Sequence, residues 1–150
     1  MAKTRARIGP ADLGIDLSRP SDGAIFRWLV ACKLFGARIS QEIAARAFRE
    51  LDKAGLLTPR KLASADWQQL VDLLGAGGYR RYDESTAREL IEVGKLAAEK
   101  YGGKVGRIRD GASSKNELTE RLQEFKGIGR TAAQIFLREM PPDWTDVSGG

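Results

Sequence analysis

Two glycines that bracket an isoleucine, Gly127 and Gly129, have the clearest chemical potential in the sequence. They lie in the stretch FKGIGRTAAQIF, between two runs with helical spacing. A tight link between two helices needs glycine where φ is positive or where another backbone approaches closely, so a purely structural turn also explains them. Gly129 nevertheless begins the second helix without a side chain, which leaves free N–H groups and the positive end of the helix dipole facing outward. Such a helix start binds anions, and we expect a phosphate.

The neighbours of the two glycines favour phosphate binding. Lys126 and Arg130 flank them with positive charge, and Ile128 can insert between the two helices and fix the link. The bare helix start at Gly129 has no side chain to read a base, so the hairpin would contact a nucleic-acid backbone without sequence preference. The expected phosphate-binding residues are Lys126, Gly127, Ile128, Gly129, Arg130 and Thr131.

The composition suits a polyanionic partner and excludes several classes of site. The 150 residues carry 25 Lys plus Arg against 20 Asp plus Glu, a net charge of +5, which favours nucleic acid without establishing it. Histidine is absent from the sequence and Cys32 is its one cysteine. A Ser-His-Asp triad, a His-ligated metal and a four-cysteine zinc or iron–sulfur site are therefore excluded.

The sequence contains no pattern that predicts a membrane or secretory protein. No apolar run reaches the roughly 18 residues that are needed to span a bilayer. The basic start MAKTRARIGP is not followed by an apolar segment, so it does not read as a secretory signal. We expect an intracellular protein, cytoplasmic or nucleoid-associated, that is monomeric and makes no membrane contact.

Helical spacing continues along most of the chain and predicts an all-α fold, a compact bundle of about seven helices. We expect a long helix over residues 83–101 with Asp83 as its N-cap, and Gly55 as the left-handed residue that ends an earlier helix. The other expected helix starts have a Ser or Thr cap: Ser21, Ser40, Thr58 and Ser114.

The same spacing divides the chain and predicts its core. We expect a basic N-terminal arm over residues 1–21, a helical domain over 22–140, and a short polar tail over 141–150. Trp28, Trp67 and Cys32 lie on apolar stripes, so they are expected in the core rather than at a binding surface.

Three segments together resemble the DNA glycosylases related to endonuclease III and alkyl-adenine glycosylase. FKGIGRTAAQIF resembles the family's helix-hairpin-helix, approximately L/F-P-G-[IV]-G-x-x-T-A, with Lys126 where proline is usual. FRWLVACKLFGARISQEIAARAFREL is similar to the early helix pair of the family. LLGAGGYRRYDESTARELIEVGKLAAEKYGGKV is similar to its later glycine loop and long helix. The similarity covers about residues 22–140, in the family's order and spacing, with the helix-hairpin-helix at about 115–140.

The resemblance implies a partner and a reaction. These enzymes extrude a damaged or mismatched base from double-stranded DNA and hydrolyse its N-glycosidic bond. Bifunctional members also cleave the strand through a hairpin lysine that forms a Schiff base, and Thr131 stands at that position here. The resemblance thus implies a monofunctional glycosylase without AP lyase activity. It implies no cofactor held by side chains, and leaves room for a monovalent cation at the hairpin backbone.

The resemblance also places a catalytic aspartate shortly after the second helix of the hairpin. Asp146 in PPDWTDV is the nearest candidate by spacing and Asp143 is the second. The chain ends four residues after Asp146, whereas family members continue into further helices. Either the chain is a minimal or truncated member, or it keeps the DNA-gripping half without catalysis, in which case Asp146 is a solvated tail carboxylate.

Two loops match the positions at which the family probes DNA. Arg38, in the turn FGARIS, falls where the family fills the space left by the extruded base, although an arginine that caps a helix end is an equally simple explanation. A second loop interleaves aromatic and basic residues, which suits stacking and phosphate contact but also an ordinary exposed loop. Its residues are Tyr79, Arg80, Arg81 and Tyr82.

Three hypotheses follow from the sequence. The first is a monofunctional DNA glycosylase, and the second is a non-catalytic helix-hairpin-helix module that binds duplex or distorted DNA. The third is a structural helical domain whose hairpin contacts protein, which the basic charge and the two probing loops disfavour.

Overall fold

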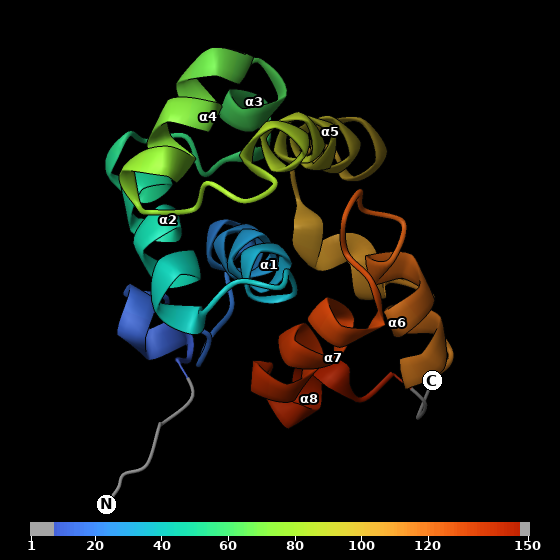
Figure 1. The fold of residues 1–150 in the computed structure, drawn as a ribbon. Coiled ribbons are helices and arrows are strands. Elements are labelled where there is room, and N and C mark those ends of the chain that lie inside the picture. Colours follow the sequence, from blue (N-terminus) through green and yellow to red (C-terminus); the bar gives the residue numbers. More distant parts are fainter. Residues whose placement is uncertain (1–7, 148–150) are drawn as a thin grey trace, which may run out of the picture.

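Helix α1 (Asp22–Phe35) lies at the centre of the structure (Figure 1). The computed structural model describes residues 8–147. The side chain of Ser21 caps α1, as expected, by accepting a hydrogen bond from the N–H of Ala24. Nine of the fourteen residues of α1 are buried, whereas a surface helix buries a single stripe. The other helices therefore pack around α1 on nearly all sides.

The remaining helices form two groups on either side of α1. In Figure 1, α2 to α5 cover one side, and α6, α7 and α8 lie on the other. Residues 8–147 contain eight α-helices and no strand, so the all-α class is confirmed and the tail adds one helix to the expected number. The elements besides α1 are η1 (Pro10–Leu13), α2 (Gln41–Lys53), α3 (Pro59–Ala63), α4 (Trp67–Ala76), α5 (Asp83–Tyr101), η2 (Val105–Arg109), α6 (Lys115–Leu122), α7 (Arg130–Glu139) and α8 (Pro142–Thr145).

Local capping chemistry sets most helix boundaries. The side chains of Ser40, Thr58 and Ser114 each accept a hydrogen bond from a backbone N–H three residues later. Gly55 follows α2 with a φ of 73°, the left-handed conformation that closes a helix without a Cβ penalty. These predictions from the sequence are confirmed.

The start of α5 differs from the expectation. Tyr82, not Asp83, is the N-cap, because the Tyr82 carbonyl accepts the first helical hydrogen bond from the N–H of Thr86 at 2.8 Å. Tyr82 adopts a φ of 65°, a left-handed conformation that is rare outside glycine. Asp83 instead occupies the first turn, where its negative charge interacts favourably with the positive end of the helix dipole.

Both flanks of the expected domain are more ordered than a free arm and a polar tail. Residues 1–7 of the expected arm and 148–150 of the tail lie outside the described residues. Leu13, Ile15 and Leu17 are buried in the core. At the other end α8 places the ring of Trp144 against Phe136, with the centroids 6.0 Å apart. The packed core thus extends beyond residues 22–140 in both directions.

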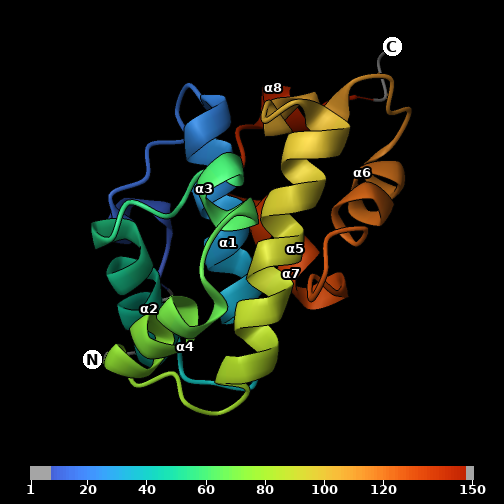
Figure 2. The same cartoon turned by 90° about the horizontal axis from the view of Figure 1, so that it is seen from above.

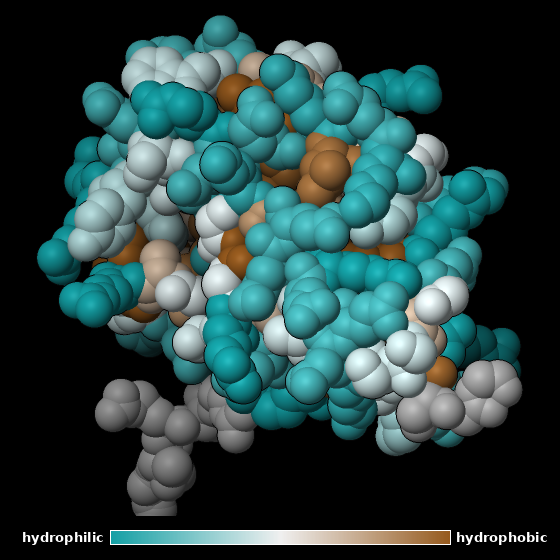
Figure 3. Space-filling view, turned by 90° about the vertical axis from the view of Figure 1, so that its right-hand side faces the viewer, coloured by the Kyte–Doolittle hydropathy of each residue, from teal (hydrophilic) through white to brown (hydrophobic). Residues whose placement is uncertain are grey.

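The core contains the apolar residues that the helical stripes predict. Trp28 and Cys32 are fully buried, and burial raises the pKa of the Cys32 thiol. Trp67 is half-buried, and its indole N–H donates to the carbonyl of Glu84 at 3.1 Å. The face to the right in Figure 1 is mostly hydrophilic, with apolar atoms in recesses between polar side chains (Figure 3). Within residues 8–147, no helix combines the length and the apolar character that crossing a membrane requires.

Helices α3 and α5 approach each other at a glycine. A Cβ on Gly94, in the middle of α5, would lie 2.5 Å from the backbone nitrogen of Ala63 and 2.7 Å from the carbonyl oxygen of Pro59. Glycine is unfavourable inside a helix, so its use here reflects this contact between two backbones. The contact sets the position of α5 beside α3 (Figure 2).

We expect Gly94→Ala to destabilise the protein by about 1–3 kcal/mol, because the new methyl group meets backbone atoms that must move. Gly23→Ala is the matched control, since Gly23 lies in α1 with open space around its Cα, and the same change there should keep or raise stability. Urea unfolding of the two variants measures the difference. Equal free energies of unfolding would contradict a close contact at Gly94.

Candidate functional site

Three segments that are distant in sequence meet at one cavity of about 340 Å³. The turn after α1 contributes Arg38, the start of α5 and its preceding loop contribute Tyr79 and Tyr82, and the loop between α6 and α7 contributes Gly127. In Figure 2 the first two segments lie along the lower edge of the molecule and the third lies in its lower half. The structure thus brings together residues from all three groups that the sequence singled out for binding.

A buried ion pair that the sequence analysis missed also lines this cavity. The ammonium of Lys33, on α1, donates to Oε1 of Glu89, on α5, at 2.6 Å. The Lys33 side chain is 4% exposed and the Glu89 side chain 36%. Burial lowers the pKa of Lys33, while the hydrogen bond to Glu89 opposes that change. A signal existed, because Lys33 follows Leu29 by four residues and therefore shares its buried face.

Gly127 covers this ion pair. Its φ is 78°, and a Cβ at this position would overlap both Nζ of Lys33 and Oε1 of Glu89. The backbone of the loop can pass over the pair only because residue 127 has no side chain. The glycine that the sequence predicted at a tight turn is thus also required by a contact with α1 and α5.

The loop between α6 and α7 presents an uncapped helix start. Ile128 is 4% exposed, and its N–H donates to the carbonyl of Phe125 at 3.0 Å. Gly129 is the N-cap of α7, and no side chain caps that helix. The first N–H groups of an α-helix have no partner within the helix, and here Gly129, Arg130 and Thr131 are exposed at that end. The buried isoleucine and the open helix start agree with the arrangement expected for this segment.

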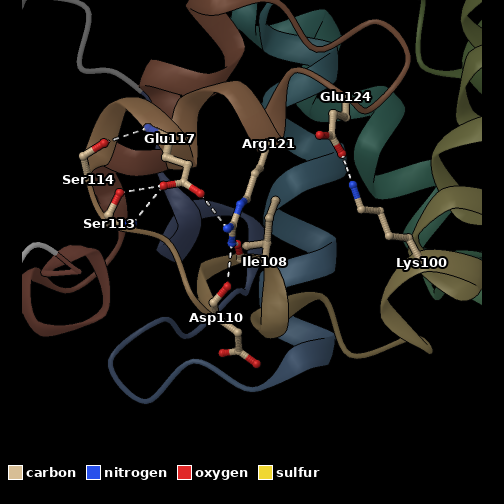
Figure 4. A network of polar contacts seen from close by, with 8 residues as sticks. All are labelled: Lys100, Ile108, Asp110, Ser113, Ser114, Glu117, Arg121 and Glu124. Carbon is tan, nitrogen blue, oxygen red and sulfur yellow. Dashed lines mark hydrogen bonds and ion pairs between the residues drawn. The ribbon is translucent and has the colours of Figure 1, made fainter. Parts of the chain in front are cut away.

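Hydrogen bonds fix α6 at its first turn. The carboxylate of Glu117 accepts from the N–H and the hydroxyl of Ser113 at 2.9 and 2.8 Å, and from Arg121 at 2.8 Å (Figure 4). The hydrogen bonds from Ser113, followed by Arg121, lower the pKa of Glu117. The expected cap at Ser114 is present. The Glu117 carboxylate accepts from the N–H of Ser113 rather than from that of Ser114, so the two residues do not form a reciprocal capping box.

Further polar contacts support α6 and the loop that follows it. Arg121 donates to the carbonyls of Ile108 and Asp110, each at 2.7 Å, which joins α6 to η2 (Figure 4). Lys100, near the end of α5, pairs with Glu124 at the start of the loop. Helix α6 and the loop that carries Gly127 are therefore held by contacts with η2 and with α5.

The loop before α5 presents one exposed aromatic ring. Tyr79 is 1% exposed, its hydroxyl lies 3.4 Å from Oγ1 of Thr86, and burial raises its pKa. Tyr82 is 47% exposed, and the Arg81 guanidinium lies 5.2 Å from its ring centroid. The burial of Tyr79 leaves Tyr82 as the ring of this loop that is available for stacking. Arg80 and Arg81 are exposed beside it.

The left-handed backbone of Tyr82 stores conformational strain. A non-glycine residue in this region costs about 1–3 kcal/mol, and such residues cluster at binding and catalytic sites. Because Tyr82 is both strained and at the cavity, its placement is itself a reason to regard the cavity as the functional site.

The predicted aspartates do not lie at this cavity. Asp146 borders a separate hollow with Ser114 and Lys115, at the start of α6, whereas Gly127 follows the other end of that helix. Eight residues of α-helix span about 12 Å. Asp143 is exposed, and its backbone carbonyl accepts from Arg109. The structure therefore separates both aspartates from the residues around Gly127.

Comparison with known proteins adds no assignment to this geometry. No model of a known protein family matches the chain, and a search of curated proteins finds no match either. In the part of the chain from residue 8 to 147, no three His, Cys, Asp or Glu side chains gather closely enough to hold a metal ion. The residue types around the cavity and their placement are therefore the basis for proposing a function.

We expect Gly127→Ala to be more destabilising than Gly111→Ala by about 1–3 kcal/mol. Both residues have a positive φ, but an added Cβ meets open space at Gly111 and the Lys33–Glu89 pair at Gly127. The left-handed conformation penalises both variants by about 1–2 kcal/mol, and only Gly127→Ala adds a steric overlap. Chemical unfolding of both variants tests this, and equal losses would mean that Gly127 is needed for its backbone conformation alone.

Proposed function

We propose that the protein binds duplex DNA at a damaged or mismatched base pair, accepts the extruded base in the cavity, and hydrolyses its N-glycosidic bond without cutting the strand. The observation that carries the proposal is the convergence of Arg38, Tyr82 and Gly127 on one cavity. A purely structural turn at Gly127 does not require the two other segments to meet it. The likeness of all three segments to DNA glycosylases supplies the reaction.

Positive charge on or near the residues that line the cavity supports a DNA backbone as the partner. Arg38 lines the cavity, and the exposed Arg80, Arg81, Lys126 and Arg130 lie next to or within three residues of its other lining residues. In this proposal α6, the 123–129 loop and α7 form a helix-hairpin-helix, and the open start of α7 receives a phosphate. Backbone contacts of this kind position a protein on DNA without reading sequence.

The size of the cavity suits one small group. Its volume of about 340 Å³ lies at the lower end of the range of small-molecule sites, about 300–1,000 Å³. Tyr82 at its edge supplies an aromatic surface, and stacking of a base on such a ring contributes about 1–3 kcal/mol. Thr131, which cannot form a Schiff base, supports hydrolysis without strand cleavage.

The alternative function is binding of distorted DNA without hydrolysis. The position of Asp146 favours it, because a carboxylate must lie beside the sugar to stabilise an oxocarbenium-like transition state, and Asp146 borders a different hollow. Binding and hydrolysis are therefore tested separately.

For binding, we expect the double variant Lys126→Gln and Arg130→Gln to weaken affinity for duplex DNA and to reduce the slope of log K against log salt by about 2, one for each lost phosphate contact. The matched control removes two charges from α3, Arg60→Gln with Lys61→Gln, which are exposed and line no part of the cavity. Fluorescence anisotropy at several salt concentrations gives the slopes. Salt-insensitive affinity, or equal effects of the two double variants, would instead favour a hairpin that contacts protein.

For hydrolysis, we expect alkali-dependent cleavage of at least one duplex that carries uracil, a T·G mismatch, 8-oxoguanine, hypoxanthine or an alkyl-adenine. Alkali is required because excision leaves an intact strand with an abasic site. Salt-sensitive binding without cleavage of any duplex would establish the non-catalytic alternative. Cleavage of an abasic duplex without alkali would show lyase activity and contradict the role inferred from Thr131.

A further inference from the structure

We infer that Glu89 is the catalytic carboxylate of the proposed hydrolysis, a role for which the sequence resemblance favours Asp146. The inference rests on the proposed function and names the residue that performs its chemical step. Among residues 8–147, Glu89 is the acidic residue that lines the cavity with Arg38, Tyr82 and Gly127. A carboxylate can act on the sugar of an extruded nucleotide only if it faces the space which that nucleotide enters.

The two oxygens of Glu89 have different surroundings. Oε1 accepts the hydrogen bond from Lys33 at 2.6 Å, directly below the backbone of Gly127. Within the described part of the chain, Oε2 forms no hydrogen bond or ion pair. The side chain is 36% exposed, so one oxygen is anchored while the carboxylate keeps access to the cavity. A reactive group needs this combination of fixed position and open approach.

Lys33 supplies the electrostatic part of the arrangement. Its ammonium lies 2.6 Å from Oε1 of Glu89, and charge-assisted hydrogen bonds of this type hold a carboxylate in a defined orientation. The lysine is itself held by the core around α1, because its side chain is 4% exposed. We regard Lys33 as a positioning residue that acts through Glu89.

The reaction balances with water as the second substrate. The C1′–N bond breaks, and its electron pair leaves with the base nitrogen, which takes up a proton. Positive charge develops on the sugar, and the Glu89 carboxylate stabilises it. The oxygen of a water molecule then bonds to C1′ while Glu89 accepts a proton from that water and passes it to the solvent, which replaces the proton taken up by the base nitrogen. No oxidant, metal or lysine adduct takes part, which agrees with the threonine at position 131.

The test is single-turnover excision by Glu89→Gln, measured on the duplex that the wild-type protein cleaves best. The amide can still accept the hydrogen bond from Lys33, so the cavity floor is retained while the charge and the basic oxygen are lost. We expect the excision rate constant to fall by about 10²–10⁴-fold, with the affinity for DNA retained. The urea midpoint should fall as well, because a neutral amide no longer compensates the buried Lys33 charge, so the rates are compared without urea at a temperature at which both proteins are folded. Glu89→Asp, which restores the charge on a shorter side chain, should recover part of the rate.

The matched control is Glu92→Gln on the same helix, because Glu92 is exposed and pairs only with Lys95 among the described residues. It should excise at the wild-type rate. Excision that survives Glu89→Gln, or that Asp146→Asn abolishes while Glu89→Gln does not, overturns the role of Glu89 and leaves the proposed function standing. If the wild-type protein excises no base, both the role of Glu89 and the hydrolytic function are wrong, whereas DNA binding remains separately measurable.

Discussion

The burial of the Lys33 ammonium is the constraint on which the geometry of the site depends. Removing such a charge from water costs several kcal/mol unless a partner compensates it, and Glu89 is that partner. The contact joins the last turn of α1 to the second turn of α5, two segments that are 56 residues apart in sequence. The backbone of Gly127 lies directly above it, so the contact also reaches the loop between α6 and α7. One electrostatic requirement thus relates three segments of the chain.

The rest of the fold holds the partners of this contact in place. α1 is anchored by apolar packing around most of its surface. α5 is positioned by the backbone contact at Gly94. Arg121 ties the helix before the loop to η2. These supports fix the helices between which the cavity lies, while the loops that carry Arg38, Tyr79 and Gly127 form part of its lining.

The sequence was most informative where structure is decided locally. Cap residues such as Ser40 and Ser114 bond to backbone three residues away, so a short window contains the whole cause of the helix start. Tyr82 was not predicted as a cap, because its conformation is imposed by the loop and the cavity rather than by the preference of tyrosine. The chain before α1 was expected to be a basic arm. Its buried residues Leu13, Ile15 and Leu17 alternate with exposed ones, and three such positions are too short a pattern to predict burial by themselves. Their burial depends on contacts with distant helices.

The candidate site shows the same difference between local signals, which the sequence reveals, and long-range contacts, which it does not. The sequence identified Gly127, because a glycine in a tight turn is a local signal. It did not predict the contact of Gly127 with Lys33 and Glu89, because contacts between distant segments leave no trace in the spacing of residues. Asp146 was chosen by its distance along the chain from the hairpin. Distance along the chain does not fix direction after a helix ends, and α8 turns that aspartate toward the start of α6.

The burial of Lys33 distinguishes the Lys33–Glu89 pair from the exposed arginines and the lysine near the cavity, although the Glu89 side chain is itself 36% exposed. At 1 M salt the Debye length is about 3 Å, and exposed charges are screened while buried pairs are screened much less. High ionic strength would therefore weaken electrostatic contacts of the exposed side chains more than the partly buried pair beneath Gly127. If the exposed side chains bind a polyanion as proposed, ionic strength alone would separate that binding from the internal order of the cavity.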